Sequence, residues 1–409
     1  MNESMEAFLQ STANWLGVNT NGTLEILCAN GELLRISPKQ FGNEIAQLSN
    51  FCVCHKLSHR RYFLSNMQPP ADILELFAFA YPVRFTVPTI PGLLDALDLK
   101  TTDHLGLDLS HIAEHCLQKI VQMPKHKTLE TLIYAMIYAN WDWAFEIAMR
   151  LNFTDFDPPS DLFSRLRHWD FLPEWEEQPQ RPPVSSQTIT PDEARQTLSD
   201  IVHTHGEKRQ QQYDYSAFIA HSFSSGRAQG LEAPFVLAEA ATGIGKTLGY
   251  LAPAIKWSDR NEGSVWFSTY TRHLQRQIID ELKNIFPNPD VFDKRVVMRK
   301  GRENYLCLLN LEESLQSGTS NPKIIIALTL IIRWLMNDHS GDLTSGRFPS
   351  WLFEIMGKQF ITELGDRRGE CIHSSCAHWK KCFIETNQRK TQYGDFIVIN
   401  MDPDKVSAV

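Results

Sequence analysis

A glycine-rich stretch at residues 240–247 has the residue types and spacing of a phosphate-binding loop. It reads AATGIGKT, which fits the Walker A spacing with Ala in the first place. Gly243 and Gly245 allow backbone N–H groups to turn inward around phosphate oxygens, and a helix from about Leu248 adds its positive end. Lys246 could then reach the β- and γ-phosphates, and the Thr247 hydroxyl could bind Mg²⁺. The stretch predicts an ATP–Mg²⁺ site; a chance glycine turn before a helix is the alternative.

Four cysteines in the last quarter of the chain form a second chemical pattern. Cys307 stands alone, and Cys371, Cys376 and Cys382 follow as C-x4-C-x5-C. Four thiolates can ligate a [4Fe–4S] cube, although thiolate suits Zn²⁺ equally well. His373 and His378 lie close enough in sequence to replace a cysteine. The pattern favours a cluster over zinc or free thiols. The other four cysteines lack a matching partner pair and are predicted to pack as ordinary residues: Cys28, Cys52, Cys54 and Cys116.

The elements that would position the loop follow an α/β order. Residues 235–240 (FVLAEA) are predicted to form a buried strand that enters the loop, and residues 265–269 (VWFST) a second strand. The following helix, residues 271–285, carries apolar side chains on one face and is predicted to pack on the sheet: Leu274, Ile278, Leu282 and Ile285. Residues 394–400 (GDFIVIN) complete the pattern as a further buried strand.

The chain before the loop divides into a block and a linker. Residues 1–172 contain short alternating runs at 23–28 and 33–36, typical of strands, and a helical period over 129–151. Trp141 and Trp143 are predicted to lie in the core of this block. Residues 173–190 are proline-rich without apolar periodicity and are predicted to be a linker. A capping box of Thr190 and Glu193, with Pro191 between them, then predicts a helix start and a second block over 191–409.

Composition limits the classes of protein that remain. The chain has 409 residues with 43% hydrophobic and 22% charged residues and a net charge of −8, which is ordinary for a folded protein of two or three domains. Any nucleic-acid contact must therefore come from a local groove rather than from overall charge. The acidic N-terminus lacks the features of a signal peptide, and the most apolar run, residues 324–336, is too short to span a bilayer and is predicted to be a buried helix. We expect a cytoplasmic protein without membrane contact or structural disulfides.

Several segments together resemble the iron–sulfur superfamily 2 DNA helicases of the DinG/XPD type. The resemblance covers roughly residues 205–400 and rests on the loop segment EAATGIGKTLGYLAP, the preceding RQQQYDY, the segment STYTRHLQRQ at 268–277, KGRENYLC at 300–307 and the clustered cysteines. It implies that Arg209 and Gln212, in an R-x-x-Q element, contact the adenine. It also implies that residues 268–277, similar to motif Ia, touch the DNA backbone. Cys307, Cys371, Cys376 and Cys382 would hold the [4Fe–4S] cluster.

The resemblance also implies a fold and an activity. The expected fold is a RecA-like P-loop motor domain with an incomplete parallel sheet and an iron–sulfur insert at about 300–385, preceded by an α+β N-terminal domain. That first domain lacks an early D-x-E triplet, so a degenerate nuclease or a docking module is expected there. The implied activity is 5′ to 3′ translocation on single-stranded or forked DNA, coupled to ATP hydrolysis.

Two departures from the family pattern qualify this expectation. Asn400 is followed by Met401 where the family usually has His, and no D-E-A-H-like element follows the loop. We therefore expect the N-terminal part of a helicase, which binds ATP but does not hydrolyse it alone. A non-hydrolysing ATP- or single-strand-binding regulatory module is the alternative. The sequence indicates no oligomeric state.

Overall fold

The computed structural model describes residues 14–400 except 20–21, 40–47, 49, 64–69, 125, 180, 204–208, 224–234, 318–319, 357 and 367–369. The acidic N-terminus and Met401 lie outside the described residues. The chain divides into two compact units. Unit 1 comprises Met1–Glu174 with Arg302–Phe383, and unit 2 comprises Trp175–Gly301 with Ile384–Val409.

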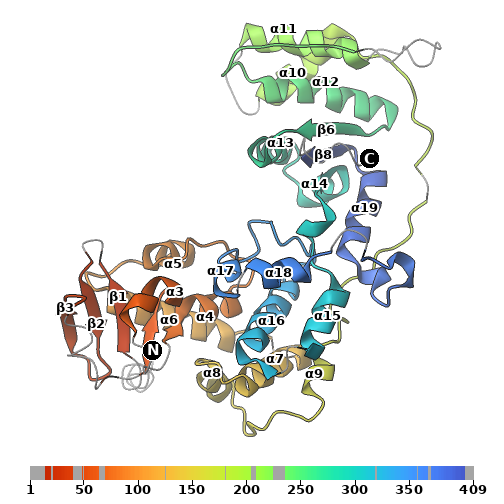
Figure 1. The fold of residues 1–409 in the computed structure, drawn as a ribbon. Helices are drawn as coiled ribbons and strands as arrows, with labels where there is room; N and C mark the ends of the chain where they lie inside the picture. Colours follow the sequence, from red (N-terminus) through yellow and green to blue (C-terminus); the bar gives the residue numbers. More distant parts are fainter. Residues whose placement is uncertain are drawn as a thin grey trace. The chain divides into compact units, whose positions relative to one another are not determined.

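Unit 1 contains a mixed sheet whose described strands have the order β3-β2-β1-β4-β5. The strands are β1 (Asn14–Val18), β2 (Leu24–Leu27), β3 (Leu33–Ile36), β4 (Phe51–Val53) and β5 (Ala71–Asp72). Strands β1, β2 and β3 form an antiparallel meander, whereas β4 and β5 run parallel to β1. Figure 1 shows the meander in red and orange. Apolar side chains on this sheet, among them Leu16, Ile26 and Val53, are fully buried, and the strands predicted at 23–28 and 33–36 are confirmed.

Helices cover this sheet and extend unit 1. They are α3 (Lys56–His59), α4 (Ile73–Ala80), α5 (Ile90–Leu97), α6 (Leu105–Val121), α7 (Lys127–Tyr138), α8 (Ala144–Arg150) and α9 (Leu162–Arg165), with the short turn η1 (Arg60–Tyr62). Helix α6 packs on β1 and β2 and on α4. Trp141 and Trp143 are buried as predicted, and their indole N–H groups donate to Glu75 Oε2 and the Asp72 carbonyl.

The cysteine-bearing segment belongs to unit 1. Its elements are η4 (Arg302–Asn304), α15 (Leu308–Ser317), α16 (Pro322–Leu335), α17 (Leu352–Met356), α18 (Lys358–Leu364), η6 (His373–Ser375) and η7 (Trp379–Lys381). Helix α16, buried over most of its length as predicted for residues 324–336, packs against α4 and α7. The segment at 302–383 and the first block therefore share one core.

Unit 2 has a parallel sheet in the order β6-β8-β7 among its described residues. Strand β8 (Phe396–Asn400) lies between β6 (Val265–Thr269) and β7 (Val296–Arg299). Its residues Phe396, Ile397 and Val398 are fully buried, as an apolar run covered on both faces requires. The parallel α/β character predicted from the sequence is confirmed here.

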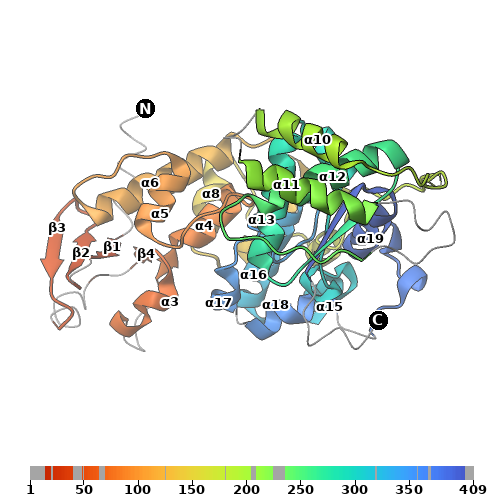
Figure 2. The same ribbon diagram turned by 90° about the horizontal axis from the view of Figure 1, so that it is seen from above.

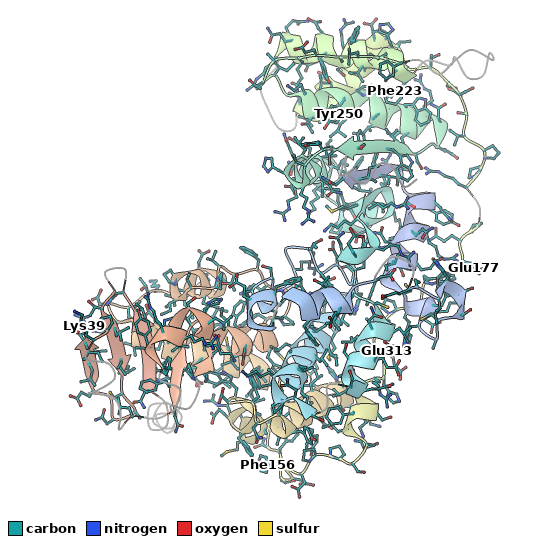
Figure 3. All side chains as sticks on the ribbon, viewed as in Figure 1. Lys39, Phe156, Glu177, Phe223, Tyr250 and Glu313 are labelled. Carbon is teal, nitrogen blue, oxygen red and sulfur yellow. The ribbon has the colours of Figure 1, made fainter. Side chains whose placement is uncertain are left out.

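Helices surround this sheet. They are α10 (Pro191–His203), α11 (Gln210–Ile219), α12 (Lys246–Asn261), α13 (Arg272–Ile285), α14 (Pro289–Arg295) and α19 (Phe383–Tyr393), with the turn η2 (Ala220–Phe223). Figure 2 shows α10, α11 and α12 together, and each of the three contacts the other two. Phe223 and Tyr250, labelled in Figure 3, come from η2 and α12.

The predicted helix start at Thr190 is confirmed. Glu193 N donates to Thr190 Oγ1 at 3.2 Å, and Thr190 N donates to Glu193 Oε2 at 2.9 Å, which is the reciprocal geometry of a capping box. The described residues between 173 and 190 form neither helix nor strand. They are nevertheless attached, because the Arg181 guanidinium donates to Ser264 Oγ at 2.8 Å and forms an ion pair with Asp395.

Candidate nucleotide site

The glycine-rich loop has the backbone geometry that its sequence predicts. Gly243 and Gly245 have φ of +83° and +86°, in the left-handed region that favours glycine. Helix α12 begins directly afterwards at Lys246, with Gly245 as its N-cap. The first N–H groups of a helix have no partner inside it and carry a partial positive charge. The loop and the helix start therefore form a concave place for an anion.

The start of α11 supports the loop from behind. Gln212 Nε2 donates to the Gly245 carbonyl at 2.8 Å, and the Arg209 guanidinium donates to the Gly243 carbonyl. Gln212 is buried, with 4% of its surface exposed, whereas Arg209 lines the adjacent cavity. A Cβ atom on Gly245 would lie 2.2 Å from Gln212 Nε2, so this close contact requires glycine. In this conformation the Gln212 side chain fixes the backbone of the loop at Gly245.

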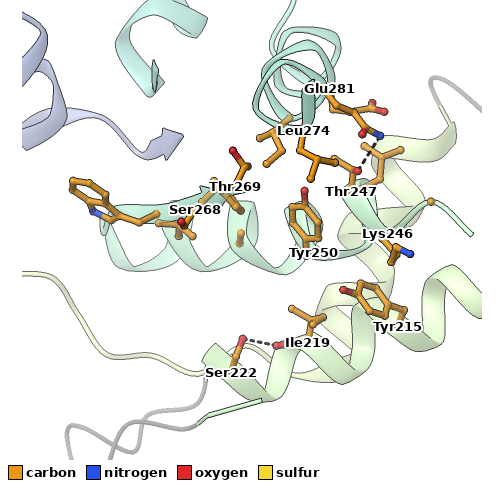
Figure 4. Close-up of a pocket in the computed structure, with 18 of the residues that line it drawn as sticks. Tyr215, Ile219, Ser222, Lys246, Thr247, Tyr250, Ser268, Thr269, Leu274 and Glu281 are labelled. Carbon is orange, nitrogen blue, oxygen red and sulfur yellow. Dashed lines mark hydrogen bonds between the residues drawn. The ribbon is translucent and has the colours of Figure 1, made fainter. Parts of the chain in front are cut away.

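Lys246 and Thr247 lie together at the loop's end of α12 (Figure 4). Lys246 Nζ donates to the carbonyl oxygens of Ala240 at 2.8 Å and Ala241 at 3.2 Å. Gln277 Nε2 donates to Thr247 Oγ1 at 3.3 Å. Gln277 was not predicted as a site residue; it belongs to the quoted segment 268–277, but only the fold brings α13 beside α12.

A cavity of about 800 Å³ opens beside the loop, a volume typical of a small-molecule site. It is lined by α11, η2, the loop, α12, β6 and α13. Besides the loop it presents the aromatic side chains of Tyr215, Phe223 and Tyr250, and the carboxylate of Glu281. In Figure 4, Tyr215 and Tyr250 lie on the same side of the cavity as Lys246, and Glu281 lies near Thr247. These four residues were not predicted, because each becomes part of the site only through tertiary packing.

The strand predicted at residues 235–240 is wrong. These residues form neither helix nor strand, and Phe235 and Leu237 are 91% and 84% exposed. The prediction used apolar content alone, but a segment becomes a strand only when another strand pairs with it. Among the residues that the structure describes, none of the strands pairs with this segment.

The segment that resembles motif Ia is confirmed as a strand followed by a helix. Thr271 caps α13 by accepting from Leu274 N at 3.2 Å, and Gln275 Nε2 reaches the Val398 carbonyl at 3.3 Å. Ile278 and Leu282 are buried on the sheet side as predicted. Leu274 is the exception: it is 44% exposed and lines the cavity, because it lies in the first turn of α13, next to the loop rather than over the sheet.

The four predicted ligand cysteines all lie in unit 1 and are half-buried. Cys307 directly precedes α15, and its pKa is raised to about 11, chiefly by burial and also by Asp366 and Cys382 nearby. The Cys371 thiol lies next to Arg302, whose guanidinium donates to Asp366 Oδ2 at 2.6 Å. The turns η6 and η7 of the clustered cysteines contact each other.

These cysteines match a thiolate site in chemistry but do not close around one point. Within the described ranges, no three His, Cys, Asp or Glu side chains come near enough together to hold one metal ion. Cys307 lies near Cys382, and Cys371 near Arg302. His378, the sequence alternative to a cysteine, instead hydrogen-bonds Glu312 at 2.6 Å. The four cysteines therefore match a thiolate site in residue type, but their side chains are not gathered into one site in this structure.

Comparison with known proteins agrees with this geometry. The sequence profile described as DEAD/DEAH box helicase matches residues 228–338, which include the loop, α12 and α13. The residues around the loop are thus similar in sequence to a DEAD/DEAH box helicase domain, and their parallel α/β fold agrees with that similarity. No described helix is both long and apolar enough to cross a membrane.

Part of the chain is also similar to individual proteins of known name. The chain is 30% identical over 166 residues to "ATP-dependent DNA helicase YoaA" of Escherichia coli strain K12, covering 40% of this chain and 25% of that protein. It is 30% identical over 148 residues to "3'-5' exonuclease DinG" of Bacillus subtilis, covering 35% and 15%. It is 28% identical over 218 residues to "ATP-dependent helicase DinG" of Mycobacterium tuberculosis strain H37Rv, covering 48% and 30%. The chain spans under a third of these relatives, and the predicted resemblance to DinG-like helicases is confirmed.

Proposed function

We propose that this chain carries the ATP-binding part of a DinG-type DNA helicase. The observation that supports this most directly is the Gly243–Thr247 loop, which opens α12 beside a cavity of about 800 Å³. The proposed whole activity is 5′ to 3′ translocation on single-stranded or forked DNA driven by ATP hydrolysis. The proposed nucleotide ligands are the six loop residues Thr242, Gly243, Ile244, Gly245, Lys246 and Thr247. Arg209 and Gln212 are proposed to contact the adenine.

The chain's own residues suggest how the nucleotide would be held. The loop N–H groups and the start of α12 would receive the phosphates. The Lys246 ammonium, now bound to two neutral carbonyls, would exchange them for phosphate oxygens, a stronger charge-assisted contact. The Thr247 hydroxyl would turn from Gln277 toward Mg²⁺. Mg²⁺ supplies neutralisation of the phosphate charge when it is bound.

Replacing Lys246 tests the nucleotide site. Lys246→Ala should weaken ATP–Mg²⁺ binding by at least about tenfold, since one charge-assisted contact contributes about 1.5–3 kcal/mol. The thermal unfolding midpoint should change little, because the hydrogen bonds of this side chain to described residues go to two loop carbonyls. Lys283→Ala on α13, an exposed lysine outside the cavity, is the matched control. Equal calorimetric affinity of Lys246→Ala and wild type would eliminate the proposed site.

A non-hydrolysing regulatory module is the second candidate function. It is favoured by the composition of the cavity, where the one carboxylate among the described lining residues is Glu281, which belongs to α13 and not to the loop or to the end of a strand. ATP turnover measured with and without single-stranded DNA tests the two candidates in one direction. Turnover stimulated by DNA would support a motor and eliminate the module. ATP binding without turnover is expected of both, because the ATP-binding part of a helicase is not expected to hydrolyse ATP alone.

We further propose that Cys307, Cys371, Cys376 and Cys382 hold a [4Fe–4S] cluster. Support comes from the thiolate donor set, from its placement in one unit and from the nearness of Cys307 to Cys382. Iron and sulfide analysis after anaerobic purification tests this. Single Cys→Ser changes at the four positions should each lower the iron content. Cys28 is buried in the core of the β1–β4 sheet, so Cys28→Ala should leave the iron content unchanged. Stoichiometric zinc without iron would replace the cluster with a zinc site.

A further inference from the structure

A second cavity lies in unit 1, away from every residue assigned above. It has a volume of about 460 Å³ and is formed by the turn after α4, the end of α6, the start of α7 and the end of α16. The lining residues that matter for its chemistry are Tyr81, Arg84, Lys119, Met123, His126 and Arg333, and the remainder are apolar or neutral. The lining therefore contains three permanent cations and no Asp or Glu.

Arg333 is the unusual member of this lining. It is 7% exposed, and burial lowers its pKa to about 10. Its Nε donates to the Phe79 carbonyl at 3.0 Å and its Nη2 approaches Met123 Sδ at 3.0 Å. No carboxylate among the described residues forms an ion pair with it. A buried charge without a counter-charge is costly, and a guanidinium has five N–H donors, so most of its binding capacity remains unused.

The other cations surround the same space. The Arg84 guanidinium and the Lys119 ammonium lie 5.1 Å and 5.9 Å from the centre of the Tyr81 ring. His126, the N-cap of α7, has a pKa lowered by burial and by Arg333. The Glu130 carboxylate opposes this shift in the pKa of His126, but Glu130 does not line the cavity. Like charges brought together in this way repel each other, and a bound anion would relieve that repulsion.

We infer that this cavity binds a small anion carrying more than one phosphate group, with Arg333 at its base and Arg84 and Lys119 at its rim. The volume exceeds what a single oxyanion fills and suits a compact phosphorylated molecule. Arginine suits this role because its planar fork of donors matches phosphate oxygens, and the two rim cations can contact a second phosphate. Packing of α16 against α4 and α7 creates the site, so neither sequence segment contains it alone.

Pyrophosphate is the probe, used with the full chain carrying Lys246→Ala so that the glycine-rich loop contributes as little as possible. Calorimetry should detect binding, and Lys119→Ala and Arg84→Ala should each weaken it by about fivefold or more. Both side chains are exposed at the rim, so these variants should fold normally. Arg333→Met, which keeps the apolar stem, should abolish binding, and Arg333→Lys should restore part of it. Lys127→Ala, an exposed lysine at the start of α7 outside the lining, is the charge-matched control.

Three outcomes decide the inference. Absence of pyrophosphate binding at millimolar concentration would overturn it. Equal weakening by Lys127→Ala and Lys119→Ala would also overturn it, because general charge would then explain the binding. Competition by a 5′-phosphorylated oligonucleotide, but not by its 5′-hydroxyl counterpart, would support the phosphate chemistry and identify a strand end as its source; competition by neither would leave a free small molecule as the ligand.

Discussion

Gly245→Ala is the most informative single change in the candidate nucleotide site. A Cβ atom at this position would lie 2.2 Å from Nε2 and 2.8 Å from Cδ of Gln212, whose side chain is buried. The backbone is also at φ +86°, where L side chains are strained. Gly243 offers a matched control, since its φ is +83° but nothing lies within 4 Å of the added Cβ. The two variants therefore separate backbone strain from steric overlap.

The magnitudes follow from these two contributions. A left-handed conformation costs a residue with a side chain about 1–2 kcal/mol, and overpacking at a filled position costs about 1–3 kcal/mol. Gly243→Ala carries only the first cost and Gly245→Ala carries both. The loop can escape the strain by leaving its conformation, but nucleotide binding must then restore it. At about 1.4 kcal/mol per tenfold, Gly245→Ala should bind ATP roughly tenfold more weakly than Gly243→Ala.

Calorimetric titration with ATP–Mg²⁺ measures this difference, and circular dichroism melting confirms that each variant is folded. Adding Gln212→Ala to Gly245→Ala removes the atoms that the new Cβ meets, so the pair should couple favourably by about 1 kcal/mol in a double-mutant cycle. Indistinguishable affinities for the two glycine variants, together with no coupling to Gln212, would refute the claim that this contact shapes the nucleotide loop.

Two further predictions concern stability. Burial and the neighbouring Glu75 carboxylate raise the pKa of Asp72 to about 6, so the folded state holds this proton more tightly than the unfolded chain does. The contribution of Asp72 to the free energy of unfolding should therefore be full below about pH 4 and should be lost as the pH rises through about 6. Asp72→Asn should flatten the pH dependence of the free energy of unfolding in that window. Glu193→Ala should destabilise unit 2 by about 1–2 kcal/mol in chemical denaturation, because it removes the capping box at Thr190 and the ion pair with Arg260, whereas its neighbour Asp192→Ala, whose side chain is 93% exposed, should cost less than about 0.5 kcal/mol.

Local signals in the sequence predicted much of unit 2. The capping box at Thr190, the apolar face of α13 and the buried strand β8 are each encoded within a few residues, and each is confirmed. The Gly243–Thr247 loop is likewise local, because glycines with positive φ before a helix start need no distant partner. Signals of this kind survive without knowledge of tertiary contacts.

Non-local features could not be predicted in the same way. Residues 235–240 have strand-like composition, yet strand formation depends on a pairing partner that composition does not specify. The bracing of Gly245 by Gln212 and the approach of Gln277 to Thr247 join residues about thirty positions apart. The shared core of α16 with α4 and α7 joins segments about 190 to 250 positions apart. No periodicity in either segment indicates its partner.

The pairing of cations with carboxylates connects two of the ligand sites proposed here, the nucleotide site at Lys246 and the cavity at Arg333. Where unit 1 buries a cation for structure alone, it supplies a carboxylate: Arg150 pairs with Glu114 at 2.9 Å, and Lys56 pairs with Glu75. Lys246 and Arg333 differ, because each faces a cavity and each is held only by neutral acceptors among the described residues. A cation kept without a counter-charge beside an open space is stabilised by an incoming anion, and pairing it internally would compete with that anion. Introducing a carboxylate beside the Arg333 guanidinium, as in Met123→Glu at the position whose Sδ lies 3.0 Å from Arg333 Nη2, should stabilise unit 1 while weakening pyrophosphate binding. Stabilisation without any loss of binding would show that Arg333 serves packing alone.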